Sequence, residues 1–163
     1  ILGPVAELNA FTDTIVNEIE TEDCASISMR MESGALATSS VTLGSANDIS
    51  RFRFCFQNLT AESGLAPYTP AEDTWTFTAR GDTKQADIDA ILASVASPSS
   101  GFTGFLEATA RSINGTKGDE VTLEDGRRSI EFVTAVYTSS RDQEVVDFPI
   151  DRGAALYDGW SLG

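Results

Sequence analysis

Alternating apolar and polar residues dominate the first half of the chain and predict β-strands there. The run Ala25–Met31 has one apolar face, and the run Ala35–Leu43 repeats the alternation after Glu32-Ser33-Gly34. Gly34 can adopt the positive φ of a tight turn, so the two runs predict a hairpin. A further strand is predicted before this hairpin, over Val5–Val16.

A third run carries aromatic residues on alternate positions. Phe52, Phe54 and Phe56 alternate with Arg51 and Arg53, which predicts a strand with one aromatic face. In one interpretation the rings belong to the core and the arginines are solvated. In the other, Arg51 or Arg53 contacts an anionic or polyhydroxy ligand, because a guanidinium group donates several hydrogen bonds in a fixed geometry.

Hydroxyl side chains line one face of the predicted hairpin and part of a fourth strand. Thr38, Ser40 and Thr42 share a face in the hairpin, and threonines alternate with Trp75 and Phe77 in the later strand. Such a face suits a second protein surface, or it reflects only the preference of threonine for strands. Both interpretations stay open.

From residue 82 onward the apolar residues recur at helical spacing. Ile88, Ile91, Leu92 and Val95 predict a first helix, with Asp82 or Thr83 as its N-cap. A second helix is predicted from Phe102 to Ile113, closed by Asn114-Gly115. A third begins at Thr122, where Asp125 completes a capping box. A short strand over Val145–Phe148 follows it.

Strands that precede helices along the chain predict an α+β fold. We expect a single domain over residues 1–163, with a largely antiparallel open sheet and helices packed on one face. Each predicted helix has one apolar stripe and can cover only one side of the sheet. The other face is therefore predicted to be available for a homo-oligomer contact.

Composition limits the classes of function. The chain has 163 residues, 25 acidic against 11 basic ones, a net charge of −14 and no histidine. This charge disfavours nucleic-acid binding, because the phosphates would be repelled. The absence of histidine excludes Ser-His and Cys-His catalytic pairs and histidine zinc sites within the chain. No apolar run is long enough to span a membrane, so we expect a protein without membrane contact.

Motifs for cofactors are scarce. The sequence contains no Gly-x-Gly-x-x-Gly and no Walker loop. The acidic stretch Glu18–Asp23 fits a hard cation less well than it fits a solvated strand edge, so no metal site is predicted. Cys24 and Cys55 are too few for a disulfide framework and favour a reducing cytoplasm.

A succession of short motifs runs along nearly the whole chain. The motifs are Leu2-Gly3-Pro4-Val5, Glu22-Asp23-Cys24-Ala25, Glu32-Ser33-Gly34-Ala35-Leu36, Gly101-Phe102, Asp125-Gly126-Arg127-Arg128, Ala135-Val136-Tyr137-Thr138-Ser139 and Val145-Val146-Asp147-Phe148-Pro149. This succession resembles the C-terminal domain of the Gfo/Idh/MocA oxidoreductases. Each motif is weak alone, whereas their order and spacing together are specific.

The resemblance implies an NAD(P)-dependent dehydrogenase that acts on a sugar, polyol or related hydroxy compound. In that family an N-terminal Rossmann domain binds NAD or NADP, and the catalytic Lys, Asp and His precede the Leu-Gly-Pro-Val segment. We therefore expect no catalytic and no cofactor-binding residue in this chain, catalytic residues upstream of Ile1, and no activity of the fragment alone. The resemblance also implies that Asp82–Ser100 is an additional helical segment.

Three residues are predicted to line the substrate pocket: Arg53, Tyr68 and Trp75, a guanidinium donor and two aromatics with polar tips. The alternative is that each of them has only a structural role. An alternative function is a stand-alone module that binds a small ligand or dimerises without catalysis. An independent module is expected to begin with Met, whereas this chain begins with Ile1.

Overall fold

The structure is a computed structural model that describes residues 1–96, 99–116, 119–157 and 159. The chain divides into two compact units, a finer division than the single domain considered above. The first unit contains Ile1–Ser45 and Thr122–Gly163, and the second contains Ala46–Val121.

The first unit is a four-stranded antiparallel sheet with one long helix. The strand order is β3-β2-β1-β7. The elements are β1 (Val5–Asp13), β2 (Cys24–Met31), β3 (Leu36–Thr42), β7 (Val146–Asp147) and α3 (Leu123–Asp142). The predicted hairpin is confirmed as β2 and β3, and Gly34 in its turn has a φ of +84°.

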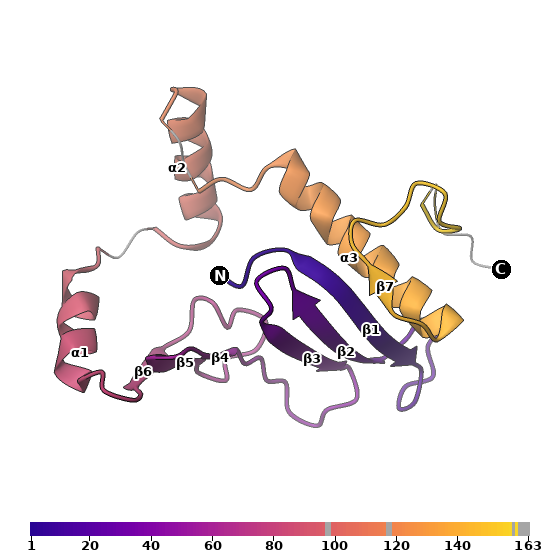
Figure 1. Ribbon diagram of the computed structural model, residues 1–163, viewed down its shortest axis with the longest axis horizontal. Coiled ribbons are helices and arrows are strands. Elements are labelled where there is room, and N and C mark those ends of the chain that lie inside the picture. The colour runs from indigo at the N-terminus through magenta and orange to yellow at the C-terminus, as the bar shows by residue number, and fades with distance from the viewer. Residues whose placement is uncertain (97–98, 117–118, 158, 160–163) are drawn as a thin grey trace. The chain divides into compact units, whose positions relative to one another are not determined.

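The core of the first unit lies between the sheet and α3, which runs alongside β1 (Figure 1). Strand periodicity turns Leu8 and Ala10 of β1 toward the helix, where the neighbouring Ile27 of β2 joins them. The buried cluster consists of Leu8, Ala10, Ile27, Ala135, Val136 and Val146.

Two serines of α3 complete the edge of β1 where β7 ends. Strand β7 pairs only with Glu7 and Leu8, so the next outward N–H groups of β1 need other acceptors. The Ser139 hydroxyl accepts from the Ala10 N–H at 3.0 Å, and the Ser140 hydroxyl accepts from the Thr12 N–H at 2.9 Å. Helix α3 thus takes the place of a longer seventh strand.

The opposite face of this sheet is open within the first unit. The cross-strand pairs Ser28–Thr38 and Ser26–Ser40 give it an exposed hydroxyl surface, as the alternation predicts. The Arg30 Nε donates to Glu7 Oε1 at 2.7 Å. The charges of this pair therefore largely cancel at the surface.

The second unit contains a three-stranded antiparallel sheet, in the order β4-β5-β6, and two helices. The elements are β4 (Arg53–Cys55), β5 (Leu59–Ser63), β6 (Trp75–Ala79), α1 (Gln85–Ser94) and α2 (Gly101–Ile113). The sequence pattern does not predict β5, because this strand is short and has few large apolar residues. Tertiary pairing on both edges makes it a strand.

Aromatic rings from the two outer strands meet over the small residues of β5. The rings of Phe54 and Trp75 stack with centroids 6.0 Å apart and an interplanar angle of 10°, and Ala61 lies beneath them in register with Phe54. The expectation that the phenylalanines form a core is only partly met, because Phe52 and Phe56 are 44% and 41% exposed.

The beginning of α1 corrects one prediction. Its N-cap is Lys84 rather than Asp82 or Thr83, and no side chain caps it. Gln85 decides this position, because its side chain accepts from the Ala79 N–H and donates to the Phe77 carbonyl, both at 2.9 Å. The helix therefore begins where it can satisfy the free edge of β6.

The observed architecture confirms the α+β class with open antiparallel sheets. Within the first unit α3 lies on one face of the sheet, and within the second unit α1 contacts β6. None of the helices in the described part of the chain is long and apolar enough to cross a membrane.

Candidate functional site

A groove of about 510 Å³ opens beside the first half of α3 in the first unit. We call it groove A. Its apolar wall contains Phe132, Phe148 and Pro149, and its charged groups are Glu32, Arg127, Arg128 and Glu131. The segment Ile1–Val5 supplies the remaining wall through Ile1, Gly3, Pro4 and Val5.

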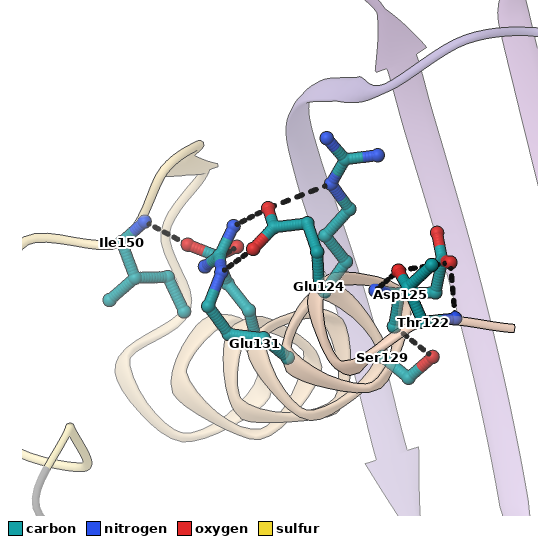
Figure 2. A network of polar contacts seen from close by, with 8 residues as sticks. Thr122, Glu124, Asp125, Ser129, Glu131 and Ile150 are labelled. Atoms are coloured by element: carbon teal, nitrogen blue, oxygen red, sulfur yellow. Dashed lines mark hydrogen bonds and ion pairs between the residues drawn. The ribbon is translucent and has the colours of Figure 1, made fainter. Parts of the chain in front are cut away.

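The start of α3 is fixed by the predicted capping box, which the structure confirms (Figure 2). The Thr122 hydroxyl accepts from the Asp125 N–H at 3.2 Å, and Asp125 Oδ2 accepts from the Thr122 N–H at 2.9 Å. Hydrogen bonds from the Thr122 side chain and backbone lower the pKa of Asp125. The first turn, which positions the arginines of groove A, therefore has a defined conformation.

Arg127 lies between two carboxylates of the same helix. Its guanidinium donates to Glu124 at 2.9 and 3.0 Å and to Glu131 at 2.8 Å. These bonds raise the pKa of Arg127, and Arg127 in turn lowers the pKa of Glu124. The other oxygen of Glu131 accepts from the Ile150 N–H at 2.9 Å (Figure 2). The network thus ties the segment after Pro149 to α3.

Arg128 is held more loosely than Arg127. Its Nε lies 3.2 Å from Glu124 Oε1, and its side chain is more than half exposed at the groove. A guanidinium beside aromatic and apolar walls can donate hydrogen bonds to a small hydroxylated molecule while the walls contact its C–H groups. Groove A therefore contains the groups needed to bind such a molecule.

A second groove of about 390 Å³ shares Arg127 and Glu131 with groove A. Groove B is lined by Arg127, Ile130, Glu131, Thr134, Ile150 and Tyr157. Sequence reasoning identified neither groove, although Asp125-Gly126-Arg127-Arg128 was one of the motifs of the resemblance. Spacing alone does not show that residues 1–5 and 148–150 come to the same helix.

The structure does not bring the three predicted pocket residues together. Arg53 lies 3.8 Å from Glu62 on one face of the β4-β5-β6 sheet, whereas Trp75 belongs to the aromatic cluster on the opposite face. Tyr68 lies in a loop, where its hydroxyl donates to Asp48 at 2.7 Å. This bond raises the pKa of Tyr68.

Asp23 of the acidic stretch receives hydrogen bonds from backbone amides. It is buried, and its carboxylate accepts the N–H groups of Ile15, Val16 and Asn17 at 2.7–2.8 Å. These donors hold its pKa far below the ordinary value. Within the described residues no group of three or more Cys, Asp or Glu side chains is arranged to hold a metal ion.

The fold is shared with solved oxidoreductases. The WlbA dehydrogenase from Bordetella pertussis, in complex with NADH and UDP-GlcNAcA, is 23% identical with a TM-score of 0.69, over 92% of this chain and 42% of that one. An aldose-aldose oxidoreductase from Caulobacter crescentus, complexed with glycerol, is 16% identical with a TM-score of 0.64, over 90% and 42%. An oxidoreductase from Agrobacterium radiobacter, in complex with NAD⁺, L-tartaric acid and magnesium, is 18% identical with a TM-score of 0.58, over 90% and 44%.

The chain spans less than half the length of these solved relatives. No curated protein sequence matches it. The family described as "Oxidoreductase family, C-terminal alpha/beta domain", the Gfo/Idh/MocA family, matches residues 2–148. Since this match covers most of the sequence and follows the motifs noted above, the chain belongs to the Gfo/Idh/MocA oxidoreductases as their C-terminal alpha/beta domain.

Proposed function

We propose that this chain is the substrate-side and oligomerisation domain of an NAD(P)-dependent oxidoreductase. The parent enzyme transfers hydride between a nicotinamide cofactor and a sugar, polyol or related hydroxy compound. The observation that carries the proposal is the family match over residues 2–148. Two of the solved relatives contain NADH or NAD⁺, and the three contain UDP-GlcNAcA, glycerol or L-tartaric acid, which supports the proposal.

The described residues do not fit a nicotinamide dinucleotide. Dinucleotide sites of the Rossmann type lie at the carboxyl ends of parallel strands, beside a glycine-rich turn. Both sheets of the described chain are antiparallel, and the sequence has no Gly-x-Gly-x-x-Gly. Cofactor binding and catalysis are therefore assigned to a separate part of the parent protein, and the fragment alone is expected to be inactive.

Groove A is the part of this chain that we propose to contact the substrate. It combines a concave shape, aromatic walls and an exposed guanidinium, the combination typical of small-molecule sites. Arg128 would donate to substrate hydroxyl groups, and the Glu131–Ile150 bond would keep the Phe148–Pro149 wall in place. Arg53, Tyr68 and Trp75 remain predicted pocket residues.

The cytoplasm is the proposed location. Cys24 and Cys55 are both free thiols in the structure. Unpaired cysteines on a partly exposed surface fit a reducing compartment better than an oxidising one. The open hydroxyl face of the four-stranded sheet is the proposed contact in a homo-oligomer.

The first experiment measures the mass of the native protein in its source cells with an antibody raised against this chain. A band about twice the size of the chain or more is expected, as a second domain requires. The purified parent is then assayed with a panel of sugars and polyols, with NAD and with NADP. A band of the size of this chain alone would contradict the proposal and favour a stand-alone module.

Substitution of Arg128 tests groove A in the parent enzyme. Arg128→Ala is expected to raise KM for the sugar about tenfold, the effect of losing one charge-assisted hydrogen bond. Arg111→Ala provides the matched control, because Arg111 is exposed on α2 and does not line the groove. Equal KM values for the wild type and Arg128→Ala would exclude this residue from the substrate site.

A further inference from the structure

Tyr68 is exposed in a backbone conformation that a tyrosine rarely adopts. Its φ is +68°, in the left-handed region, and the residue is 79% exposed. In turns, a positive φ after a proline is usually found at glycine or asparagine, whereas here a tyrosine follows Pro67. Burial of the ring does not compensate for the strain. Strained residues of this kind cluster at ligand-binding sites, so the exposed phenol is a candidate contact for a ligand.

Two side chains hold Tyr68 in this conformation. Ser50 Oγ accepts the Tyr68 N–H at 3.0 Å, and Asp48 Oδ2 accepts the Tyr68 hydroxyl at 2.7 Å. The segment that contains both of these residues is attached to β5. Ser63 donates its N–H to the Phe52 carbonyl at 3.0 Å, and its hydroxyl accepts the Phe52 N–H at 2.9 Å. The phenol is therefore held by a segment that the sheet fixes.

The loop that carries this tyrosine is also ordered from its other end. The Asp73 carboxylate accepts the backbone N–H groups of Ala66 and Thr74. A side chain at Gly64 would collide with this carboxylate, so the chain approaches it closely on that side. A loop that is already ordered loses little conformational freedom when it binds a ligand.

The Tyr68–Asp48 pair offers hydrogen-bond acceptors to a ligand. Because the Tyr68 hydroxyl donates its hydrogen to Asp48, its oxygen can accept a further hydrogen bond. The bond uses Oδ2 of the carboxylate, and Oδ1 can accept as well. The pair thus suits a ligand that donates hydrogen bonds, as hydroxyl groups do. The phenol ring can contact the C–H groups of the same ligand.

The charges around the pair disfavour an anionic ligand. Asp48 is exposed, and the loop carries two further carboxylates, Glu72 and Asp73. Arg51, the basic residue nearest to Asp48 along the chain, does not offset them, because its Nη2 lies 2.6 Å from Glu62 Oε1. The net charge of −14 adds to the repulsion of anions. An uncharged hydroxylated molecule is not repelled.

We propose that Asp48 and Tyr68 contact the substrate of the parent enzyme and select an uncharged sugar or polyol over the corresponding acid. The proposal deepens the proposed function and rests on it, because it narrows the class of hydroxy compound named there. It adds Asp48 to Tyr68, one of the predicted pocket residues. Groove A belongs to the other unit and is tested separately through Arg128→Ala.

The test measures substrate preference in the parent enzyme with D-glucose against D-glucuronate and D-galactose against D-galacturonate, with NAD and with NADP. The wild type is expected to have the higher kcat/KM for the neutral member of each pair. Asp48→Asn is expected to raise KM for the neutral sugar about tenfold with kcat unchanged, the effect of losing a charge-assisted hydrogen bond. The preference over the acid is expected to fall by at least the same factor.

Asp87→Asn is the matched control. It removes the same charge from an exposed position in the first turn of α1, away from the Tyr68 loop in sequence. It is expected to change neither KM nor the preference for the neutral sugar. An equal change with Asp87→Asn would attribute the effect to net charge and overturn the role of Asp48.

Tyr68→Phe separates substrate contact from a structural role. It keeps the ring and removes the acceptor oxygen, so KM for the neutral sugar is expected to rise while the urea midpoint stays the same. A lower urea midpoint with an unchanged KM would show a structural role only. Nuclear magnetic resonance of ring-labelled tyrosines checks the bond itself. Asp48→Asn is expected to lower the pKa of Tyr68, which the bond to Asp48 raises.

Two further results would overturn the proposal: a wild-type preference for the acids, or a KM that changes in neither Asp48→Asn nor Tyr68→Phe. A parent protein that oxidises no sugar or polyol with either nicotinamide cofactor contradicts the proposed function and this proposal with it. An active parent whose KM does not change in these variants contradicts only the role of Asp48 and Tyr68.

Discussion

In the first unit Leu8, Ala10 and Ile27 of the sheet are buried against α3, whereas the second unit buries only Ala61, Ile88 and Ala108 among its described apolar residues. Both units have an antiparallel sheet and helices, and α3 is less apolar than α1 and α2. The difference is that α3 packs on its sheet, while the apolar residues of α1 and α2 remain largely exposed.

The comparison teaches that amphipathic helices do not by themselves form a core. A helix stripe contributes to stability only when a second surface covers it. Helix α3 finds that surface within its own unit. The exposed residues of α1 and α2 include Ile91, Leu92, Phe102 and Leu106. We therefore expect the first unit to dominate the stability of the isolated chain.

The largest expected effect comes from removing a core side chain of the first unit. Leu8 is 1% exposed, so Leu8→Ala is expected to lower the free energy of unfolding by about 3–4 kcal/mol. Ile88→Ala in the second unit is the comparison, and its expected effect is faster amide hydrogen exchange in α1 only. Denaturant unfolding measures the loss of stability in Leu8→Ala, and hydrogen exchange measures the effect of Ile88→Ala. Equal losses would show that both units unfold as one.

A smaller effect is expected at the edge of β1. Ser139→Ala removes the acceptor of the Ala10 N–H and the donor to the Glu144 carbonyl, a bond of 2.6 Å. Since Ser139 is fully buried, the expected cost is about 1–3 kcal/mol of unfolding free energy. Ser140→Ala, at a partly buried position, is expected to cost less. No loss of stability with either substitution would mean that α3 does not replace the missing part of β7.

The smallest effect concerns two carboxylates that each order a loop, Asp23 in the first unit and Asp73 in the second. Asp73 accepts the Ala66 and Thr74 N–H groups at 2.9 and 2.7 Å, and these bonds lower its pKa. For both residues the pKa in the folded state lies below that in the unfolded state. Their contribution to stability is thus complete above about pH 4 and is lost as the pH falls toward the folded-state pKa.

The free energy of unfolding is expected to depend less on pH in Asp23→Asn than in Asp73→Asn. The reason is that Asp23 is buried and accepts four hydrogen bonds. Urea midpoints measured from about pH 7 down to about pH 3 give both slopes. If Asp73→Asn had the larger effect, the hydrogen bonds to Asp23 would contribute less to stability than those to Asp73, contrary to this expectation.

Sequence patterns predicted the hairpin, the capping box and the three helices because these depend on local periodicity and short-range hydrogen bonds. They did not predict β5, whose conformation depends on pairing with β4 and β6. Sequence patterns also did not predict groove A, because its walls come from residues more than 100 positions apart. Arg53 and Trp75 were grouped by chemical type, and strand alternation separates them onto opposite faces.

By itself, the sequence determined the family, the α+β class and the absence of any imidazole for catalysis, because these follow from motif order, periodicity and composition. Tertiary structure alone decided which apolar stripe becomes a core and which stays exposed. It also decided that Asp23 orders a loop and that Ser139 completes a strand edge. Burial and long-range hydrogen bonds depend on which distant segments come into contact, and the local spacing of residues does not show those contacts.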